Sequence, residues 1–145
     1  MRAWRNGEPM RSPRRKSERS RGLEAIGCGV DVVELSVFRR TMQRGGHAFL
    51  RRVFTAGEQA YARRHRRTTL LHLAARFAAK EAVMKALSQL DPARVLAMNQ
   101  IEVRNDGHGR PHIVLHDRRR HRVKVHVSLS HVKSVAVASA IAIGT

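Results

Sequence analysis

The chain has 145 residues, enough for one domain with a hydrophobic core and too few for two comfortable ones. Hydrophobic residues make up 42% of it and aromatic residues only 4%, so the core must be built mainly from aliphatic side chains. A formal charge of +18, from 29 basic and 11 acidic residues, favours an acidic partner: nucleic acid, an anionic membrane, a phosphate-rich ligand or an acidic protein.

Cysteine content and hydropathy bear on where the protein works. The single cysteine, Cys28, cannot form an internal disulfide, which predicts a reducing, cytoplasmic environment. Its place in an apolar run favours a buried, inert thiol. The longest apolar run, residues 135–143, is far shorter than the about 20 residues that span a bilayer, and no apolar segment follows the basic N-terminus as in a secretory signal. We therefore expect no membrane association.

Residues 1–22 have the composition of a disordered arm. They contain eight Arg or Lys residues, two Glu and two Pro, and almost nothing to bury, so this segment carries eight minus two, or +6, of the charge. We place the folded domain at residues 23–145. If the protein binds nucleic acid, we expect it to do so only through this arm.

The first half of the domain predicts a strand followed by helices. Residues 23–35 form an apolar run interrupted by glycines, which predicts a short strand that carries Asp31 near its end. A helix is expected over 37–44, ended by two glycines. Thr55 and Glu58 have the spacing of a capping box, which predicts another helix start. The arginine-rich run 63–68 is expected to be a solvated loop.

The next segment predicts a helix with a carboxylate on its apolar side. Glu81 lies in the middle of this stripe, where an unpaired charge is costly. It could form an i,i+4 ion pair with Lys85 or another buried ion pair. With Asp31, and with Arg76 and Lys80 nearby, it could instead bind a hard cation beside phosphates. The stripe itself recurs every three or four residues and consists of Leu70, Leu73, Ala74, Phe77, Met84 and Ser88.

The last third changes to a period of two, which is typical of strands. Residues 99–116 predict two strands joined by a turn at 105–109. Residues 121–131 alternate cleanly between apolar and polar positions. Residues 134–143 are apolar on both faces, which predicts a central strand. The order indicates an α+β fold, with early helices packed on a later antiparallel sheet in a single domain.

Several motifs occur together in a familiar order. The first, G-x-D-x-x-E, covers residues 29–34, and the second, R-F-A-x-K-E-A-x-x-K-A, covers 76–86. Phe54 and Glu58 lie between them, and G-x-P at 109–111 and S-L-S-H at 128–131 follow. Over residues 25–143 the chain resembles the holo-acyl-carrier-protein synthases, the small AcpS-type 4′-phosphopantetheinyl transferases.

The resemblance implies a fold and a reaction. It implies the 4′-phosphopantetheinyl transferase fold, a homotrimer with coenzyme A between subunits, and Mg²⁺-dependent transfer of phosphopantetheine from coenzyme A to a serine of an acidic acyl carrier protein. Adenosine 3′,5′-bisphosphate would be released. Asp31 and Glu81 correspond to the metal ligands. Glu81, or a water that it orients, would accept the serine proton, and Lys85 would act at the phosphates or the leaving oxygen.

The resemblance also implies binding residues. Coenzyme A would contact Lys85, and Arg76 and Lys80 on a flanking strip of the helix. It would further contact Ser130, and Pro111 and His131, which would face a neighbouring subunit. The acidic carrier would dock on basic residues on and just after the first helix: Arg39, Arg40, Arg44, Arg51 and Arg52.

The chain departs from the family pattern at two places. Val37 stands where family members have an arginine that contacts the carrier. No glycine lies between Gly57 and Gly107, where the family has a glycine-rich loop beside the coenzyme. The carrier could belong to fatty-acid, polyketide or peptide synthesis. The alternative from charge alone is a non-enzymatic protein that binds RNA or ribosomes, although the basic runs lack interleaved aromatic residues.

Overall fold

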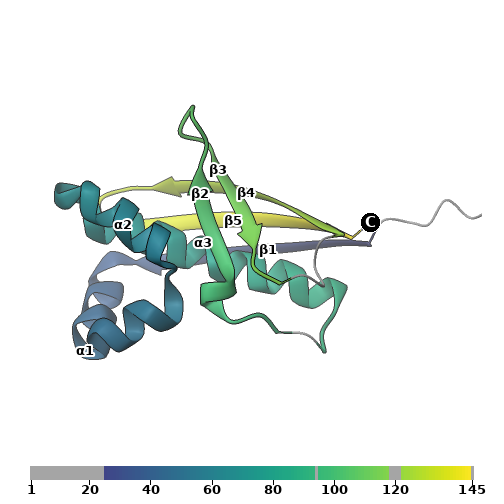
Figure 1. Ribbon diagram of the computed structural model, residues 1–145, viewed down its shortest axis with the longest axis horizontal. Coiled ribbons are helices and arrows are strands. Elements are labelled where there is room, and N and C mark those ends of the chain that lie inside the picture. Colours follow the sequence, from purple (N-terminus) through teal and green to yellow (C-terminus); the bar gives the residue numbers. More distant parts are fainter. Residues whose placement is uncertain (1–24, 94, 118–121, 145) are drawn as a thin grey trace, which may run out of the picture.

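A computed structural model of the protein describes residues 25–93, 95–117 and 122–144 (Figure 1). The fold is α+β, as the sequence predicts, and the arm expected over 1–22 lies outside the described residues. A long helix lies across one face of a three-stranded sheet, with two helices at one end and a separate hairpin. The elements are β1 (Ala25–Glu34), α1 (Leu35–Val53), α2 (Ala56–Arg64), α3 (Thr69–Leu90), β2 (Ile101–Asn105), β3 (Pro111–Leu115), β4 (Val123–His131) and β5 (Val135–Gly144), with 3₁₀ turns at 66–68 and 98–100.

The sheet is antiparallel with the strand order β1-β5-β4, which confirms the prediction of a central last strand. β5 pairs with β1 from Ala25↔Gly144 to Glu34↔Val135, and with β4 up to His131↔Ala136. On the face that meets α3, β5 presents only alanines. Their small side chains let the helix approach the sheet closely, and all four are buried: Ala136, Ala138, Ala140 and Ala142.

β1 touches α3 backbone to backbone at its two glycines. A Cβ atom on Gly27 would lie 2.0 Å from the carbonyl oxygen of Ala86, and one on Gly29 would lie 2.0 Å from that of Ala82. No side chain fits in this space. The composition suggests that the glycines interrupt the strand, but the strand continues through both of them. They are the positions at which strand and helix make contact.

The apolar stripe predicted for α3 is buried only in its first half, at Leu73 and Ala74. Ser88 is exposed, and Phe77 and Met84 are only partly buried. The helix is covered by the sheet on one side and by α1, α2 and the β2–β3 hairpin on others, so burial extends almost around it. Glu81 lies at the margin of the buried surface. The buried α3 residues are Leu73, Ala74, Ala75, Arg76, Ala78, Ala79, Lys80, Ala82, Val83, Ala86 and Leu87.

The helix α1 is longer than the sequence suggests, whereas α2 begins where it is predicted. α1 is interrupted at Gly46, whose φ of 52° is a left-handed conformation that glycine adopts at little cost, and it resumes up to Val53. The capping box that opens α2 is confirmed: the Glu58 amide donates to Thr55 Oγ1 at 3.2 Å, and the Thr55 amide donates to Glu58 Oε2 at 2.9 Å. The run 63–68 ends α2 and forms a 3₁₀ turn instead of a simple loop.

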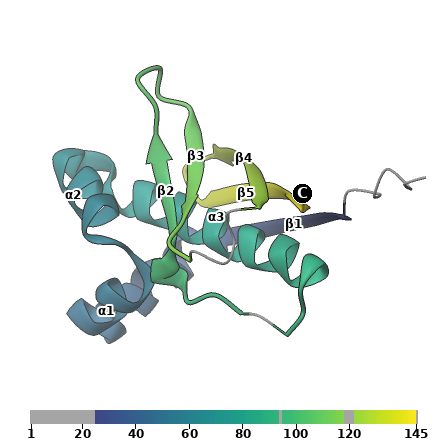
Figure 2. The same cartoon turned by 45° about the vertical axis from the view of Figure 1, so that its right-hand side comes forward.

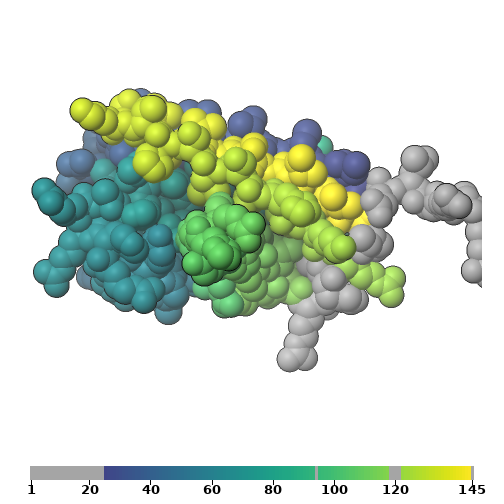
Figure 3. Space-filling view, turned by 90° about the horizontal axis from the view of Figure 1, so that it is seen from above, coloured from purple at the N-terminus to yellow at the C-terminus, as the bar shows by residue number. Residues whose placement is uncertain are grey.

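The β2–β3 hairpin is a separate two-stranded sheet that contacts β4, and its tip projects beyond the three-stranded sheet (Figure 2). Its two strands and its turn are where the sequence predicts them, with Ile101 opposite Leu115 and Asn105 opposite Pro111. In a view from above, the tip of the hairpin projects in front of β4 and β5 (Figure 3). In the part of the chain that the structure describes, no helix is both long enough and apolar enough to cross a membrane.

The sheet face opposite α3 is apolar and uncovered in the single chain. Ile26, Val30 and Val32 of β1 are 65%, 58% and 62% exposed, and Ile141 of β5 is 48% exposed. Cys28 lies on this face and is exposed, so the expectation of a buried thiol is wrong. Strand pairing places Ile141 directly opposite Cys28, so β1 and β5 form one continuous apolar surface.

Replacing Gly29 by alanine should strongly destabilise the fold. The new Cβ would meet the Ala82 carbonyl oxygen, so β1 and α3 would have to separate. We expect a loss of about 1–3 kcal/mol in the free energy of unfolding, measured by urea denaturation. Gly107→Ala is the control, because a Cβ there meets nothing within 4 Å. Equal stability of the two variants would contradict this packing.

Candidate active site

Asp31 and Glu81 meet beside the contact between β1 and α3. Asp31 is on the face of β1 that meets α3, two residues after Gly29, and Glu81 is one turn before Lys85 on α3. Lys85 Nζ lies 2.9 Å from Asp31 Oδ1 and donates to the Val30 carbonyl oxygen at 2.9 Å. The predicted association of these three side chains is therefore present, although Lys85 pairs with Asp31 and not with Glu81 as the simplest helical spacing suggests.

The pKa of Glu81 depends on its burial and on the charges beside it. Burial raises the pKa of Glu81, the negative charge of Asp31 raises it further, and Lys85 partly offsets both effects. The Asp31 side chain is 18% exposed, whereas that of Lys85 is 51% exposed. Two negative carboxylates that lie close together repel each other, and a bound cation relieves this repulsion. The lysine is accessible enough to reach a ligand from solvent.

A hollow of about 390 Å³ opens beside this pair. Phe77 of α3 and Phe38 of α1 form part of its wall, with their ring centroids 5.3 Å apart. Val37, which replaces the arginine expected from the resemblance, also faces this hollow and makes it more apolar. The lining residues are Asp31, Val32, Val33, Glu34, Val37, Phe38, Thr41, Phe77 and Glu81. The hollow thus combines carboxylates with an apolar wall.

The donor set suits a magnesium ion. Mg²⁺ is held by one or two protein carboxylates together with waters and substrate phosphates. Asp31 and Glu81 supply two hard oxygen ligands from separate elements. Across residues 25–93, 95–117 and 122–144, no three His, Cys, Asp or Glu side chains lie close enough to share a metal ion, which is unlike a structural zinc site.

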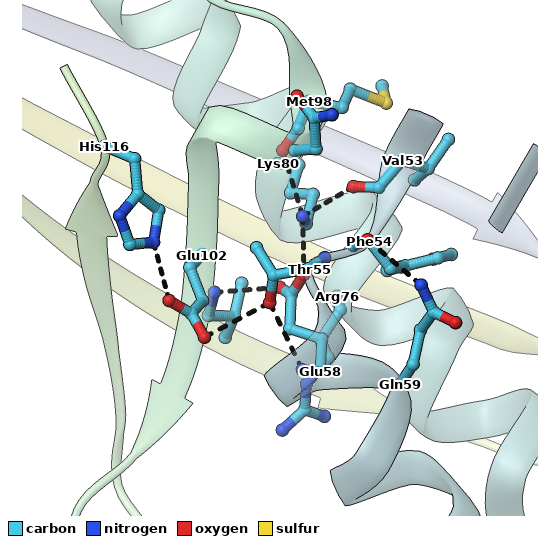
Figure 4. A network of polar contacts seen from close by, with 12 residues as sticks. Val53, Phe54, Thr55, Glu58, Gln59, Arg76, Lys80, Met98, Glu102 and His116 are labelled. Atoms are coloured by element: carbon cyan, nitrogen blue, oxygen red, sulfur yellow. Dashed lines mark hydrogen bonds and ion pairs between the residues drawn. The ribbon is translucent and has the colours of Figure 1, made fainter. Parts of the chain in front are cut away.

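Lys80 is not on an accessible strip, contrary to the prediction. Its side chain is fully buried and its Nζ lies 2.7 Å from Glu58 Oε2. It also donates to the carbonyl oxygens of Val53 and Met98, at 2.6 and 3.0 Å (Figure 4). Burial lowers the pKa of Lys80, and Glu58 partly offsets this. Because all three protons are engaged inside the core, Lys80 has no free donor for a coenzyme phosphate.

Glu58 completes this internal network. Its Oε2 also accepts the Thr55 amide at 2.9 Å, and its Oε1 accepts the Val103 amide at 2.9 Å. The carboxylate therefore joins α2, α3 and β2, and Lys80 adds the end of α1. The capping box predicted from sequence is thus part of a buried ion pair that sequence spacing did not reveal.

Arg76 is also buried, on a different side of α3 from the carboxylates. Five residues separate it from Glu81, which corresponds to about 140° around a helix. Its guanidinium lies 4.1 Å from the centroid of the Tyr61 ring and donates to Asn105 Oδ1 at 2.8 Å. Its Nε has no hydrogen-bond partner among the described residues. Burial lowers the pKa of Arg76 despite the charge of Glu58.

The remaining residues predicted to contact coenzyme A do not all lie together. Pro111 pairs across the hairpin with Asn105, the residue that Arg76 contacts. Burial lowers the pKa of His72, and the charges of His65, Arg76 and His131 lower it further, so His131 at the end of β4 is near this group. Ser130 is exposed and precedes His131 in the strand, so the two side chains lie on opposite faces of the sheet. Within one chain Lys85 is thus apart from a second group of Arg76, Pro111 and His131.

The basic residues predicted to dock a carrier are all exposed on α1: Arg39, Arg40, Arg44, Arg51 and Arg52. Sequence reasoning missed Thr41 and Phe38, which line the hollow, and Lys133, which lies beside Arg39 and Arg40. Phe38 and Thr41 are three residues apart, and Thr41 is four residues after Val37, so all three share one side of α1, a helical spacing that could have indicated them. Nothing in the local sequence indicated Lys133, because only the fold brings it to α1.

Known proteins share this sequence and fold. A family model, the 4′-phosphopantetheinyl transferase superfamily, matches residues 27–140. The chain is 40% identical over 112 residues to a holo-[acyl-carrier-protein] synthase of Thermodesulfovibrio yellowstonii, covering 77% of this chain and 93% of that protein. It is 42% identical over 123 residues to one of Moorella thermoacetica, covering 80% and 92%.

Two solved structures have the same architecture. A holo-(acyl-carrier-protein) synthase from Bacillus anthracis in complex with CoA (3′,5′-ADP) matches with a TM-score of 0.68 and 29% identity, covering 85% of this chain and all (100%) of that one. An ACPS–CoA complex of Chronobacterium ammoniagenes matches with a TM-score of 0.72 and 30% identity, covering 84% and 99%.

The fold and its carboxylate pair thus define a phosphopantetheinyl transferase, and the chain belongs to the 4′-phosphopantetheinyl transferase superfamily. Within it, the identity to curated relatives over most of both chains places it among the holo-[acyl-carrier-protein] synthases of the AcpS type.

Replacing Lys80 by methionine should destabilise the fold severely. The change leaves the Glu58 carboxylate buried without its cation, which costs about 3–5 kcal/mol in comparable pairs. Chemical denaturation measures this loss. The double variant Glu58→Gln with Lys80→Met buries no charge and should lose less stability than Lys80→Met alone. A double variant that is less stable than the single one would contradict the ion pair.

Proposed function

We propose that this protein converts an apo-acyl carrier protein to its holo form by transferring 4′-phosphopantetheine from coenzyme A to a serine hydroxyl. Adenosine 3′,5′-bisphosphate is the second product. The observation that carries the proposal is the group Asp31, Glu81 and Lys85 at the edge of a hollow, in a chain of this family. The names of the relatives and the coenzyme in the related structures support it.

Each residue of the group has a role in this chemistry. The serine oxygen forms a bond to the phosphorus that carries pantetheine, and the bond from this phosphorus to the bridging oxygen of the diphosphate breaks. Glu81, whose raised pKa suits proton transfer, accepts the serine proton directly or through a water. Lys85 moves from Asp31 to neutralise the departing oxygen. A Mg²⁺ ion held by Asp31 and Glu81 would supply further charge neutralisation at the diphosphate.

A second copy of the chain would explain the division of the coenzyme residues. The group around Arg76 and His131 lies on the other side of α3 from Lys85, so one copy does not bring both groups to one ligand. The uncovered apolar face of β1 and β5 supplies a surface for self-association. We propose a homotrimer in which one subunit contributes Lys85 and its neighbour contributes Arg76, Pro111 and His131. In this arrangement Lys80 has a structural role only.

The partner of the enzyme is an acidic carrier. The exposed arginines of α1 and the charge of +18 complement such a protein, and the reaction needs only an accessible serine. The carrier proteins of fatty-acid, polyketide and peptide synthesis all present such a serine. We propose the fatty-acid carrier and a cytoplasmic location. The alternative of an RNA- or ribosome-binding protein rests on the charge of +18 and the basic runs alone, and the family match supports the transferase instead.

Removing either carboxylate should abolish turnover without unfolding the protein. We expect Asp31→Ala and Glu81→Gln to lower kcat at least about 100-fold in the presence of Mg²⁺, because a transition-state charge of this kind is worth several kcal/mol. Transfer of phosphopantetheine is followed by the mass increase of the carrier. Near-normal rates for both variants at millimolar Mg²⁺ would overturn the assignment.

Direct metal binding separates the roles of the carboxylates from that of Lys85. Calorimetry with Mn²⁺ should show weaker binding for Asp31→Ala and Glu81→Gln. Lys85→Met removes a cation that pairs with Asp31, so this variant should bind Mn²⁺ at least as tightly as the unmodified protein while losing turnover. Weaker binding by Lys85→Met would contradict the proposed competition.

A charge on the apolar sheet face should separate the subunits. Val30 is 58% exposed in the single chain, so Val30→Asp should leave the monomer folded but bury a carboxylate in the proposed trimer. Light scattering should show a trimer for the unmodified protein and a monomer with little activity for the variant. Val95→Asp is the control for the oligomeric state alone, since Val95 is 76% exposed and lies in a loop outside the strands, whereas its activity is not compared because Val95 lines a hollow with Lys85. A monomeric, active unmodified protein would refute the trimer.

A further inference from the structure

A second hollow, of about 480 Å³, lies between the start of α1 and the turn that joins β4 to β5. These two segments lie at the same end of the molecule (Figure 1), and the Leu35 amide donates to the Ser134 carbonyl oxygen at 2.8 Å. The hydrogen bond fixes the turn against the helix. The lining residues are Glu34, Leu35, Ser36, Arg39, Arg40, Lys133 and Ser134.

The hollow is suited to an anion. Arg39, Arg40 and Lys133 supply three positive charges against the single carboxylate of Glu34, which accepts a hydrogen bond from the Ser36 hydroxyl. Glu34 is the N-cap residue of α1, so its carboxylate offsets the positive end of this helix, and the positive field of the hollow comes from the three basic side chains. All three basic side chains are exposed and can turn toward a ligand. The positive charge is therefore neither neutralised nor buried within the fold.

The second hollow adjoins the candidate active site. Glu34 lines both hollows, but Asp31 and Glu81 line only the first. Asp31 and Glu34 are three residues apart on a strand, a span of about 10 Å. A phosphate bound directly at Lys85 does not reach that far. A protein that presents its serine to Asp31 and Glu81 extends over both hollows.

We propose that this basic hollow binds a carboxylate side chain of the acidic carrier, and that Lys133 is a specificity-determining residue for that partner. The inference rests on the proposed function. In this inference Lys133, from the β4–β5 turn, contacts the carrier together with the arginines of α1. The carrier would then be recognised by two elements that the Leu35–Ser134 hydrogen bond holds in a fixed relation. A basic side chain at this turn selects for a negative charge at one place on the carrier, close to its serine.

The test is a reversal of charge at Lys133. Lys133→Glu should raise the carrier KM at least about fivefold at 0.1 M salt, where the Debye length is about 10 Å, and much less at 1 M, where it is about 3 Å. The KM for coenzyme A and the kcat should change less than twofold. Arg63→Glu is the matched control, an exposed charge reversal on α2, outside both hollows. Thermal denaturation of both variants checks that they are folded.

Each outcome separates the inference from the proposed function. If the unmodified protein modifies no acidic carrier, the proposed function fails. If it does, and Lys133→Glu and Arg63→Glu have the same carrier KM, only the inference fails. A rise in the KM for coenzyme A without one for the carrier would assign the hollow to the nucleotide and overturn the inference. A carrier variant in which one acidic residue is changed to lysine, and which restores a low carrier KM to Lys133→Glu, would support the inference and identify the opposing carboxylate.

Discussion

The direct contact of β1 with α3 is the constraint on which the rest of the structure depends. Gly27 and Gly29 leave no room for a side chain against the carbonyl oxygens of Ala86 and Ala82, so strand and helix lie at their closest possible distance. This contact places Asp31 next to α3 in register with Lys85. A helix held further away by ordinary side chains would separate Asp31 from Glu81 and Lys85, the three residues of the proposed active site. The glycines therefore contribute to function through packing alone.

Contacts on the side of α3 away from β1 fix the rotation of this helix about its axis. Lys80 and Glu81 are neighbours in sequence but point in different directions, and the two have different roles. Lys80 is held in the core by Glu58 and two carbonyl oxygens, which leaves Glu81 at the margin beside Asp31. Separating the partners of a buried ion pair is costly, because each charge is then left buried without its partner, so rotations of α3 that part Lys80 from Glu58 are disfavoured. Its contribution here is to orient the helix.

Three surfaces around the carboxylate pair differ in charge and polarity. The apolar face of β1 and β5 is suited to another copy of the chain, because the side chains exposed there are aliphatic. The start of α1 and the β4–β5 turn are suited to an acidic protein. Arg76 and His131 lie on a third side, near the hairpin. An enzyme that transfers phosphopantetheine from a nucleotide coenzyme to a protein must bind the coenzyme and the protein at the same site, and these surfaces supply separate contacts for each.

The sequence by itself determined the elements, the central strand, the capping box and the pair Asp31 and Glu81, because these follow from local periodicity and from a long, specific motif. It did not determine the side of α3 on which each residue lies. The predicted stripe ran through Glu81, and Lys80 was expected on an accessible strip, because a helical wheel shows relative angles but not which neighbours cover the helix. Only the tertiary structure buried Lys80 and Arg76 and brought Lys133 to α1. These positions depend on contacts between residues far apart in the chain, and no local pattern encodes them.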